Sequence, residues 1–233
     1  MSQEITDFLD EIEDRIGSPY LTREIFGLNA YNLIVMQRLQ FVSDEKEWAV
    51  KDPVGIARYI EKRVRLGKIV YEQSPDYSIE TVAGLALPTF TIQQLGMNNV
   101  EAHDSNFLRI EQSAYVANKL GLQPINSERK FGEWASSFEG AGNDTWLVAD
   151  QPQEDDGHYN LWTFDANYQL EQRIVKFAVR QGISLALIPA KHNTSQIPPR
   201  SERLLEYRQI MPGYEFIRHE LIPEKKILIA RLN

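Results

Sequence analysis

The segment from residue 160 to residue 188 limits the possible folds more than any other part of the sequence, because it predicts a strand, a helix and a second strand in succession. Residues 160–164 and 184–188 are short and apolar enough for buried strands. Between them, residues 166–181 repeat apolar side chains at helical spacing, and Gly182 follows as a stop signal. This order permits a crossover unit in which the two strands are parallel.

The rest of the chain does not repeat this unit regularly. The first 67 residues are predicted to be mostly helical, with the last of these helices ending at Gly67, and residues 68–73 are rich in strand formers. Further elements are predicted as helices over 106–120 and after Ser127, strands over 89–92 and 145–149, and a hairpin of 214–221 with 226–232. We therefore expect an α+β fold rather than a doubly wound sheet. Its mainly helical N-terminal region (1–67) would pack on a mixed β-sheet with flanking helices and a C-terminal β-hairpin, in an α+β domain (68–233) that forms one compact unit with it.

Composition excludes several classes of site. The chain has no cysteine, which removes disulfides, thiol nucleophiles and cysteine-ligated metal centres. The acidic, amphipathic N-terminus does not resemble a secretory signal, and no apolar run is long enough for a membrane helix. We expect a soluble, cytoplasmic protein.

Charge is unevenly distributed along the sequence. The formal net charge is −8, but residues 131–172 carry nine acidic residues and no Lys or Arg. Overall acidity argues against binding to a nucleic-acid backbone. A local basic patch is nevertheless expected on one helix face, where Arg58, Lys62 and Arg65 are spaced i, i+4 and i+7.

The acidic stretch supplies the leading functional hypothesis. Trp146 and Trp162 lie on predicted neighbouring strands that flank the acidic loop containing Glu154, Asp155 and Asp156. If both rings share one face, they form an aromatic floor beneath a negative rim, which suits a basic partner. We expect a non-catalytic binding or assembly protein that contacts a protein partner, or a second copy of itself, through residues 131–172.

The alternative is a hydrolase of phosphodiesters or nucleotides. The tripeptides His103-Asp-Ser105 and His192-Asn-Thr194 could supply two imidazoles and two hydroxyls to one phosphate. They superficially resemble the two-histidine phosphoesterase pattern. That pattern lies on alternating apolar strands, however, whereas both of these tripeptides have the flanking residues of loops or helix caps.

No sequence pattern predicts a cofactor or a metal. Gly140-Ala-Gly142 lacks the third glycine of a nucleotide-binding turn and follows a predicted helix rather than a strand. The acidic loop does not have the ligand spacing of a calcium-binding loop. The sequence thus favours a protein without catalytic activity, cofactor or metal.

Overall fold

The computed structural model describes residues 53–84, 86–105, 107–124, 126–140, 144–150, 152, 164–190, 197–220, 222 and 226–233. Its helices are α4 (Pro53–Glu72), α5 (Leu87–Gln94), α6 (Phe107–Leu120), α7 (Phe131–Ser137), α8 (Phe164–Gln181) and α9 (Arg200–Gln209). Its strands are β1 (Tyr77–Thr81), β2 (Val100–Asp104), β3 (Asn126–Glu128), β4 (Thr145–Asp150), β5 (Ser184–Ile188), β6 (Tyr214–Phe216) and β7 (Leu228–Leu232). No helix in these ranges is both long and apolar enough to cross a membrane.

All seven strands form one sheet in the order β3-β2-β1-β4-β5-β7-β6. Neighbours from β3 to β5 are parallel, and β7 is antiparallel to both β5 and β6. The chain first adds strands on one side of β1 and then, from β4 onwards, on the other side. This is a doubly wound sheet whose strand order reverses between β1 and β4.

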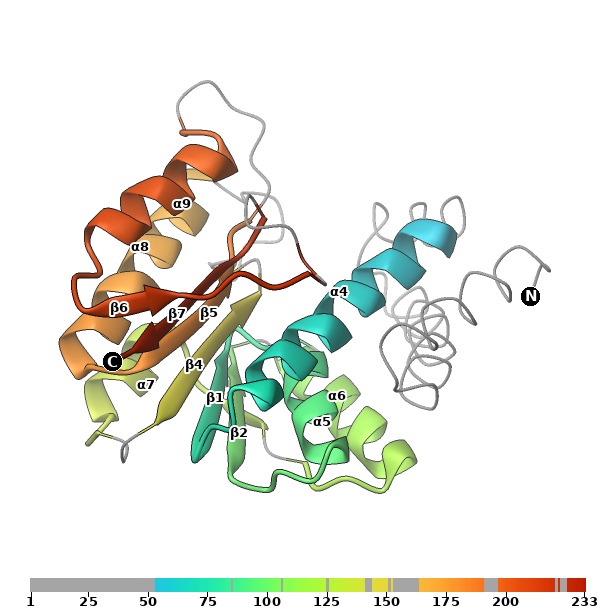
Figure 1. The fold of residues 1–233 in the computed structure, drawn as a ribbon. Coiled ribbons are helices and arrows are strands. Elements are labelled where there is room, and N and C mark those ends of the chain that lie inside the picture. Colours follow the sequence, from blue (N-terminus) through green and yellow to red (C-terminus); the bar gives the residue numbers. More distant parts are fainter. Residues whose placement is uncertain are drawn as a thin grey trace.

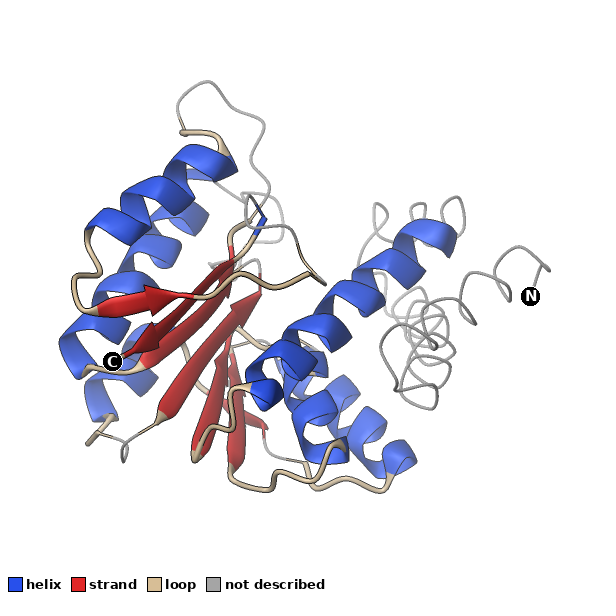
Figure 2. Ribbon diagram, in the orientation of Figure 1, coloured by secondary structure: helices blue, strands red, loops and turns tan. Residues whose placement is uncertain are grey.

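Helices cover both faces of the sheet (Figure 1, Figure 2). One core cluster joins the sheet to α7, α8 and α9, and a second joins it to α4 and α5. Along β4, Leu147 and Ala149 belong to the first cluster, while Trp146 and Val148 belong to the second. Because β4 is buried on both faces, its sequence is an almost continuous apolar run.

Helix α4 continues past Gly67, where the sequence pattern predicted a stop and a following strand. Leu66, Ile69 and Val70 are fully buried at i, i+3 and i+4, so this segment packs on the sheet with helical periodicity. A Cβ at Gly67 would come within 2.4 Å of the Pro88 carbonyl oxygen. Gly67 therefore allows α4 and α5 to pack closely and does not end the helix.

The predicted α+β class is wrong, since the described chain has an α/β fold with a mixed, largely parallel sheet between two helical layers. The error arose mainly at β1 and β2, which the sequence pattern did not identify as strands. The predicted strand at 89–92 is also wrong, because these residues lie in α5. The helices predicted before residue 53 lie outside the residues that the structure describes, and the division at residue 67 stays a prediction.

Several local predictions are confirmed. Helices were expected over 106–120 and 166–181, where α6 and α8 lie, and strands over 145–149 and 184–188, where β4 and β5 lie. The C-terminal pairing is confirmed for Tyr214–Phe216 with Leu228–Leu232. The parallel pair that was expected between 160–164 and 184–188 is formed instead by β4 and β5, with α8 between them. Phe164 begins α8, and residues 160–163 lie outside the described residues.

Candidate functional site

The carboxyl ends of β1, β2, β4 and β5 meet at one edge of the sheet. In open α/β sheets, ligands bind outside this edge, next to the point where strand order reverses. In this sheet that point lies between β1 and β4. In the register of the sheet, Glu80 on β1 lies opposite Ala102 on β2 and Val148 on β4. Asp104 follows Ala102 by two residues, and Asp150 follows Val148 by two residues. Since side chains alternate along a strand, these three carboxylates occupy one face at the ligand-binding edge.

The turn between β1 and α5 has the backbone shape of a glycine-rich loop with a single described glycine. Val82, Gly84 and Ala86 have φ values of 55°, 57° and 54°. A β-branched residue such as valine rarely adopts this left-handed conformation, which costs on the order of 1–2 kcal/mol. Backbone strain of this kind is concentrated at ligand-binding turns, so the turn is a candidate part of the site.

Hydrogen bonds attach this turn to the end of β2. The amide of Ala83 donates to the carbonyl oxygen of His103 at 3.0 Å. The amide of Gly84 donates to Oδ2 of Asp104 at 2.7 Å. In dinucleotide-binding sheets, an acidic residue about 20 positions after the turn binds ribose hydroxyls. Asp104 lies 20 residues after Gly84 and is buried.

Glu80 connects β1 to the first turn of α5. Its Oε2 accepts hydrogen bonds from the amide of Thr89 at 3.0 Å and from Oγ1 of Thr89 at 2.6 Å. Burial raises the pKa of Glu80 to about 8, although the bonds from Thr89 oppose this shift. The carboxyl group is therefore largely protonated at pH 7. The side chain of Thr81, which ends β1, is also buried, and its Oγ1 has no hydrogen-bond partner within the described ranges.

Asp150, at the end of β4, forms ion pairs with two consecutive residues of α4. Nη2 of Arg63 lies 2.7 Å from Oδ2 of Asp150, and Nζ of Lys62 lies 3.5 Å from Oδ1. Lys62 was predicted to share an exposed basic face with Arg58 and Arg65. Its ion pair instead directs it to the edge of the sheet, and the side chain of Arg58 is not among those that the structure describes.

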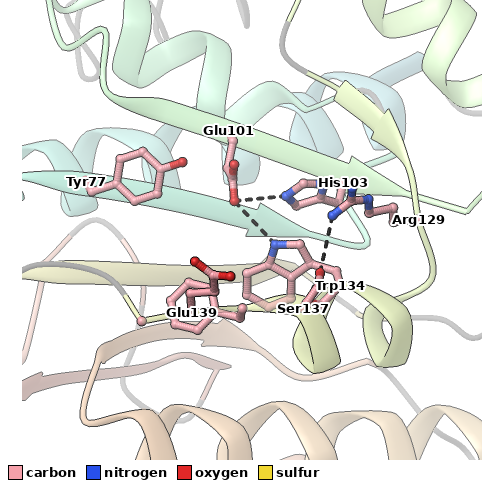
Figure 3. A pocket seen from close by; sticks show the side chains of 9 residues that line it. Tyr77, Glu101, His103, Arg129, Trp134, Ser137 and Glu139 are labelled. Atoms are coloured by element: carbon pink, nitrogen blue, oxygen red, sulfur yellow. Dashed lines mark hydrogen bonds and ion pairs between the residues drawn. The ribbon is translucent and has the colours of Figure 1, made fainter.

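A pocket of about 550 Å³ lies elsewhere, against the face of the sheet that α7 covers (Figure 3). Tyr77, Glu101 and His103 line it from the sheet, and Trp134 lines it from α7. Glu101 Oε1 lies 3.0 Å from Nε2 of His103 and accepts a hydrogen bond from Nε1 of Trp134 at 3.3 Å. Burial would raise the pKa of Glu101, but bonds from His103, Tyr77 and Trp134 together hold it below its usual range. Because Tyr77 begins β1, the pocket extends away from the carboxyl edge.

The structure places His103 on β2, so its prediction as a loop or cap residue is wrong. Its partner in the two-histidine hypothesis, His192, lies outside the described residues, as does Thr194; Ser105 follows β2 in a bend. Trp146 is fully buried against the α4 and α5 layer, which corrects its predicted role in an exposed aromatic floor. Glu154, Asp155, Asp156 and Trp162 also lie outside the described residues. No group of three potential metal ligands occurs in the part of the chain that is described.

Sequence patterns missed the residues of the carboxyl edge, namely Glu80, Gly84, Asp104 and Asp150. The spacing of 20 residues between Gly84 and Asp104 was the available signal. It was not recognised because β1 was not predicted and the turn contains non-glycine residues where glycines were sought.

Comparison with known proteins gives a fold. No protein-family model and no curated protein matches the sequence. TrmN from Thermus thermophilus and WbdD, crystallised with the kinase inhibitor LY294002, are similar at a TM-score of 0.50, with 13% and 12% identity. The matches cover 73% and 74% of this chain. They cover 49% and 40% of the other two chains, so this chain spans less than half of either protein. A ribosomal protein L11 methylase from Lactobacillus delbrueckii subsp. bulgaricus has a TM-score of 0.49 and 12% identity, with 74% of this chain and 80% of that protein covered.

Most of the similar structures are Rossmann-like methyltransferases that depend on S-adenosylmethionine. The expected non-catalytic binding or assembly function is therefore wrong, because the chain has a fold of catalytic proteins. The pairing of His103 with His192 in the hydrolase alternative is not tested, because His192 lies outside the described residues.

Proposed function

We propose that this chain binds S-adenosylmethionine at the carboxyl edge of its sheet and transfers the methyl group to an acceptor. One observation carries the proposal: the carboxylates of Asp104 and Asp150 lie on the same face of the sheet as the carboxyl group of Glu80, at the edge where strand order reverses. Carboxylate oxygens are suitable acceptors for the hydroxyl and ammonium groups of such a cofactor.

The residues at the edge fit this cofactor. Asp104 would accept a hydrogen bond from a ribose hydroxyl, since it lies at the end of β2 beside the turn. The buried Oγ1 of Thr81, which has no hydrogen-bond partner in the described chain, could bond to a ligand at this edge. The backbone of Gly84 would approach the ligand closely, because this residue has no side chain and adopts the left-handed conformation, with a φ of 57°.

When bound, S-adenosylmethionine would supply a methyl group on its sulfonium sulfur, for transfer to an acceptor lone pair with the carbon–sulfur bonding electrons left on sulfur. The protein has to position the two reactants and exclude water. Asp104 and the left-handed turn would hold the nucleoside, and the end of β4 would face the acceptor. Glu80 holds the first turn of α5 through Thr89 and so keeps the turn in place. We place this activity in the cytoplasm.

Calorimetric titration of the full chain with S-adenosyl-L-homocysteine, the product that remains after methyl transfer, tests the proposal. Saturable binding is expected, and Asp104→Asn should weaken it at least tenfold because an amide is a poorer acceptor for a hydroxyl than a carboxylate. Asp76→Asn is the matched control, since Asp76 is exposed at the opposite end of β1. Absence of binding by the unmodified protein, or equal weakening by both variants, would overturn the proposal.

A further inference from the structure

The pocket beside α7 (Figure 3) offers a second ligand site, away from the carboxyl edge. Its volume of about 550 Å³ falls within the range of about 300–1,000 Å³ that is typical of small-molecule sites. Glu101 and His103 point to the face of the sheet that α7 covers, because side chains alternate along β2 and Asp104 points to the other face. Glu80, Asp104 and Asp150 do not line the pocket. A ligand held here is therefore separate from the methyl donor proposed at the carboxyl edge.

Aromatic rings form the apolar part of this pocket. Trp134 is only 3% exposed, because its ring packs against those of His103 and Phe138, with centroids 5.5 and 5.2 Å away. Phe138 ends α7 and, like Tyr77 at the start of β1, is half-buried, so part of each ring faces the pocket. The rings of Tyr77 and Phe138 therefore provide an apolar surface for a ligand, and Trp134 supports them from behind.

Glu101 supplies a carboxylate that is fixed in position. Its Oε1 lies 3.0 Å from Nε2 of His103 and accepts a hydrogen bond from Nε1 of Trp134 at 3.3 Å. Burial opposes its ionisation, but bonds from His103, Tyr77 and Trp134 together hold its pKa below the usual range. An ionised carboxylate has about four acceptor positions, so three donors leave room for one from a ligand. Glu139, exposed just after α7, adds a second carboxylate to the lining.

Arg129 brings a guanidinium to the same pocket. Its backbone amide donates to the carbonyl oxygen of Asp104 at 3.0 Å, and its Nη1 donates to Oγ of Ser137 at 3.3 Å. A guanidinium has several donors, so this bond leaves others that can reach a carboxylate. Figure 3 shows Tyr77 and Arg129 at opposite ends of the pocket, with the carboxyl groups of Glu101 and Glu139 between them. The ionisable side chains of the lining are Tyr77, Glu101, His103, Arg129 and Glu139, and they include groups that suit both an ammonium and a carboxylate.

We propose that this pocket binds a free α-amino acid with an apolar side chain. The ammonium group would bind to Glu101 and Glu139, the carboxylate would bind to Arg129, and the side chain would contact the rings of Tyr77 and Phe138. A ligand with only a positive charge would leave Arg129 without a partner in the ligand, and one with only a negative charge would meet two carboxylates. The inference does not depend on the proposed methyl transfer.

Calorimetric titration of the full chain with L-leucine and, separately, with L-phenylalanine tests the proposal at pH 7 and constant ionic strength. Saturable binding of at least one of the two is expected. Isopentylamine is leucine without its carboxylate, and isocaproate is leucine without its amine. If L-leucine binds, each of these analogues should bind at least about tenfold more weakly, because each loses the hydrogen bonds of one charged group.

Substitutions locate the binding site. Arg129→Gln and Glu139→Gln alter exposed side chains of the pocket, so the fold should be retained, and each should weaken amino-acid binding at least about fivefold. The matched controls Arg180→Gln and Glu111→Gln, exposed on α8 and α6 and outside the pocket, should change it less than about twofold. The proposal is overturned if neither amino acid binds, if an analogue with one charge binds as tightly as L-leucine, or if the test and control variants lose affinity equally.

Discussion

Replacement of Glu80 by glutamine should make the protein more stable, and the gain should grow with pH. Burial raises the pKa of this carboxyl from 4.5 to about 8 in the folded chain. Between these two pH values the unfolded chain has released the proton and the folded chain retains it. The free energy of unfolding contributed by Glu80 is therefore fully present below about pH 4.5 and is lost as pH rises to about 8.

The size of the effect follows from the shift. At about 1.4 kcal/mol per pKa unit, a shift from 4.5 to about 8 corresponds to about 5 kcal/mol. Glutamine keeps an oxygen that can accept from Thr89 and has no proton to lose. The variant should thus match the natural protein near pH 5 and exceed its stability by several kcal/mol near pH 8.5.

Urea denaturation of both proteins at pH 5, 6.5, 8 and 9 measures this difference, provided that the transitions are two-state. Glu111→Gln, at an exposed position on α6, controls for loss of a carboxylate as such. If Glu80→Gln destabilises the protein equally at every pH, the carboxyl group is ionised in the folded state. The conclusion that Glu80 is protonated in the folded protein would then be refuted.

Two further perturbations test the packing. Arg203→Met should cost about 3–5 kcal/mol of unfolding free energy, because it removes the cation that pairs with the fully buried Glu171. Tyr207→Phe should cost only about 1 kcal/mol, since Glu171 keeps its other donors; equal losses in urea denaturation would contradict the assigned charge pair. Gly67→Ala should destabilise by on the order of 1–3 kcal/mol, because its Cβ would overlap the Pro88 carbonyl oxygen. Gly132→Ala, in α7 with nothing within 4 Å of a Cβ, should gain up to about 1 kcal/mol; a loss at both glycines in thermal melts would refute the close approach of α4 and α5.

Elements whose burial follows a simple period were predictable from the sequence. Helix α8 repeats apolar residues on one face, and β4 and β5 are short apolar runs, so pattern and structure agree. Helix α4 was cut short because Ile69 and Val70 favour strands by propensity. Packing of these residues on the sheet overrides that propensity, and such a tertiary effect is not visible in a local window.

The strands that build the site were missed because they carry its polar groups. Three of the buried residues of β1 are Ser78, Glu80 and Thr81, and β2 contains His103 and Asp104. A parallel strand buried on both faces normally has an apolar sequence, so these two were not recognised as core strands. Without β1 and β2, the regular alternation of strands and helices disappeared, and the pattern favoured α+β.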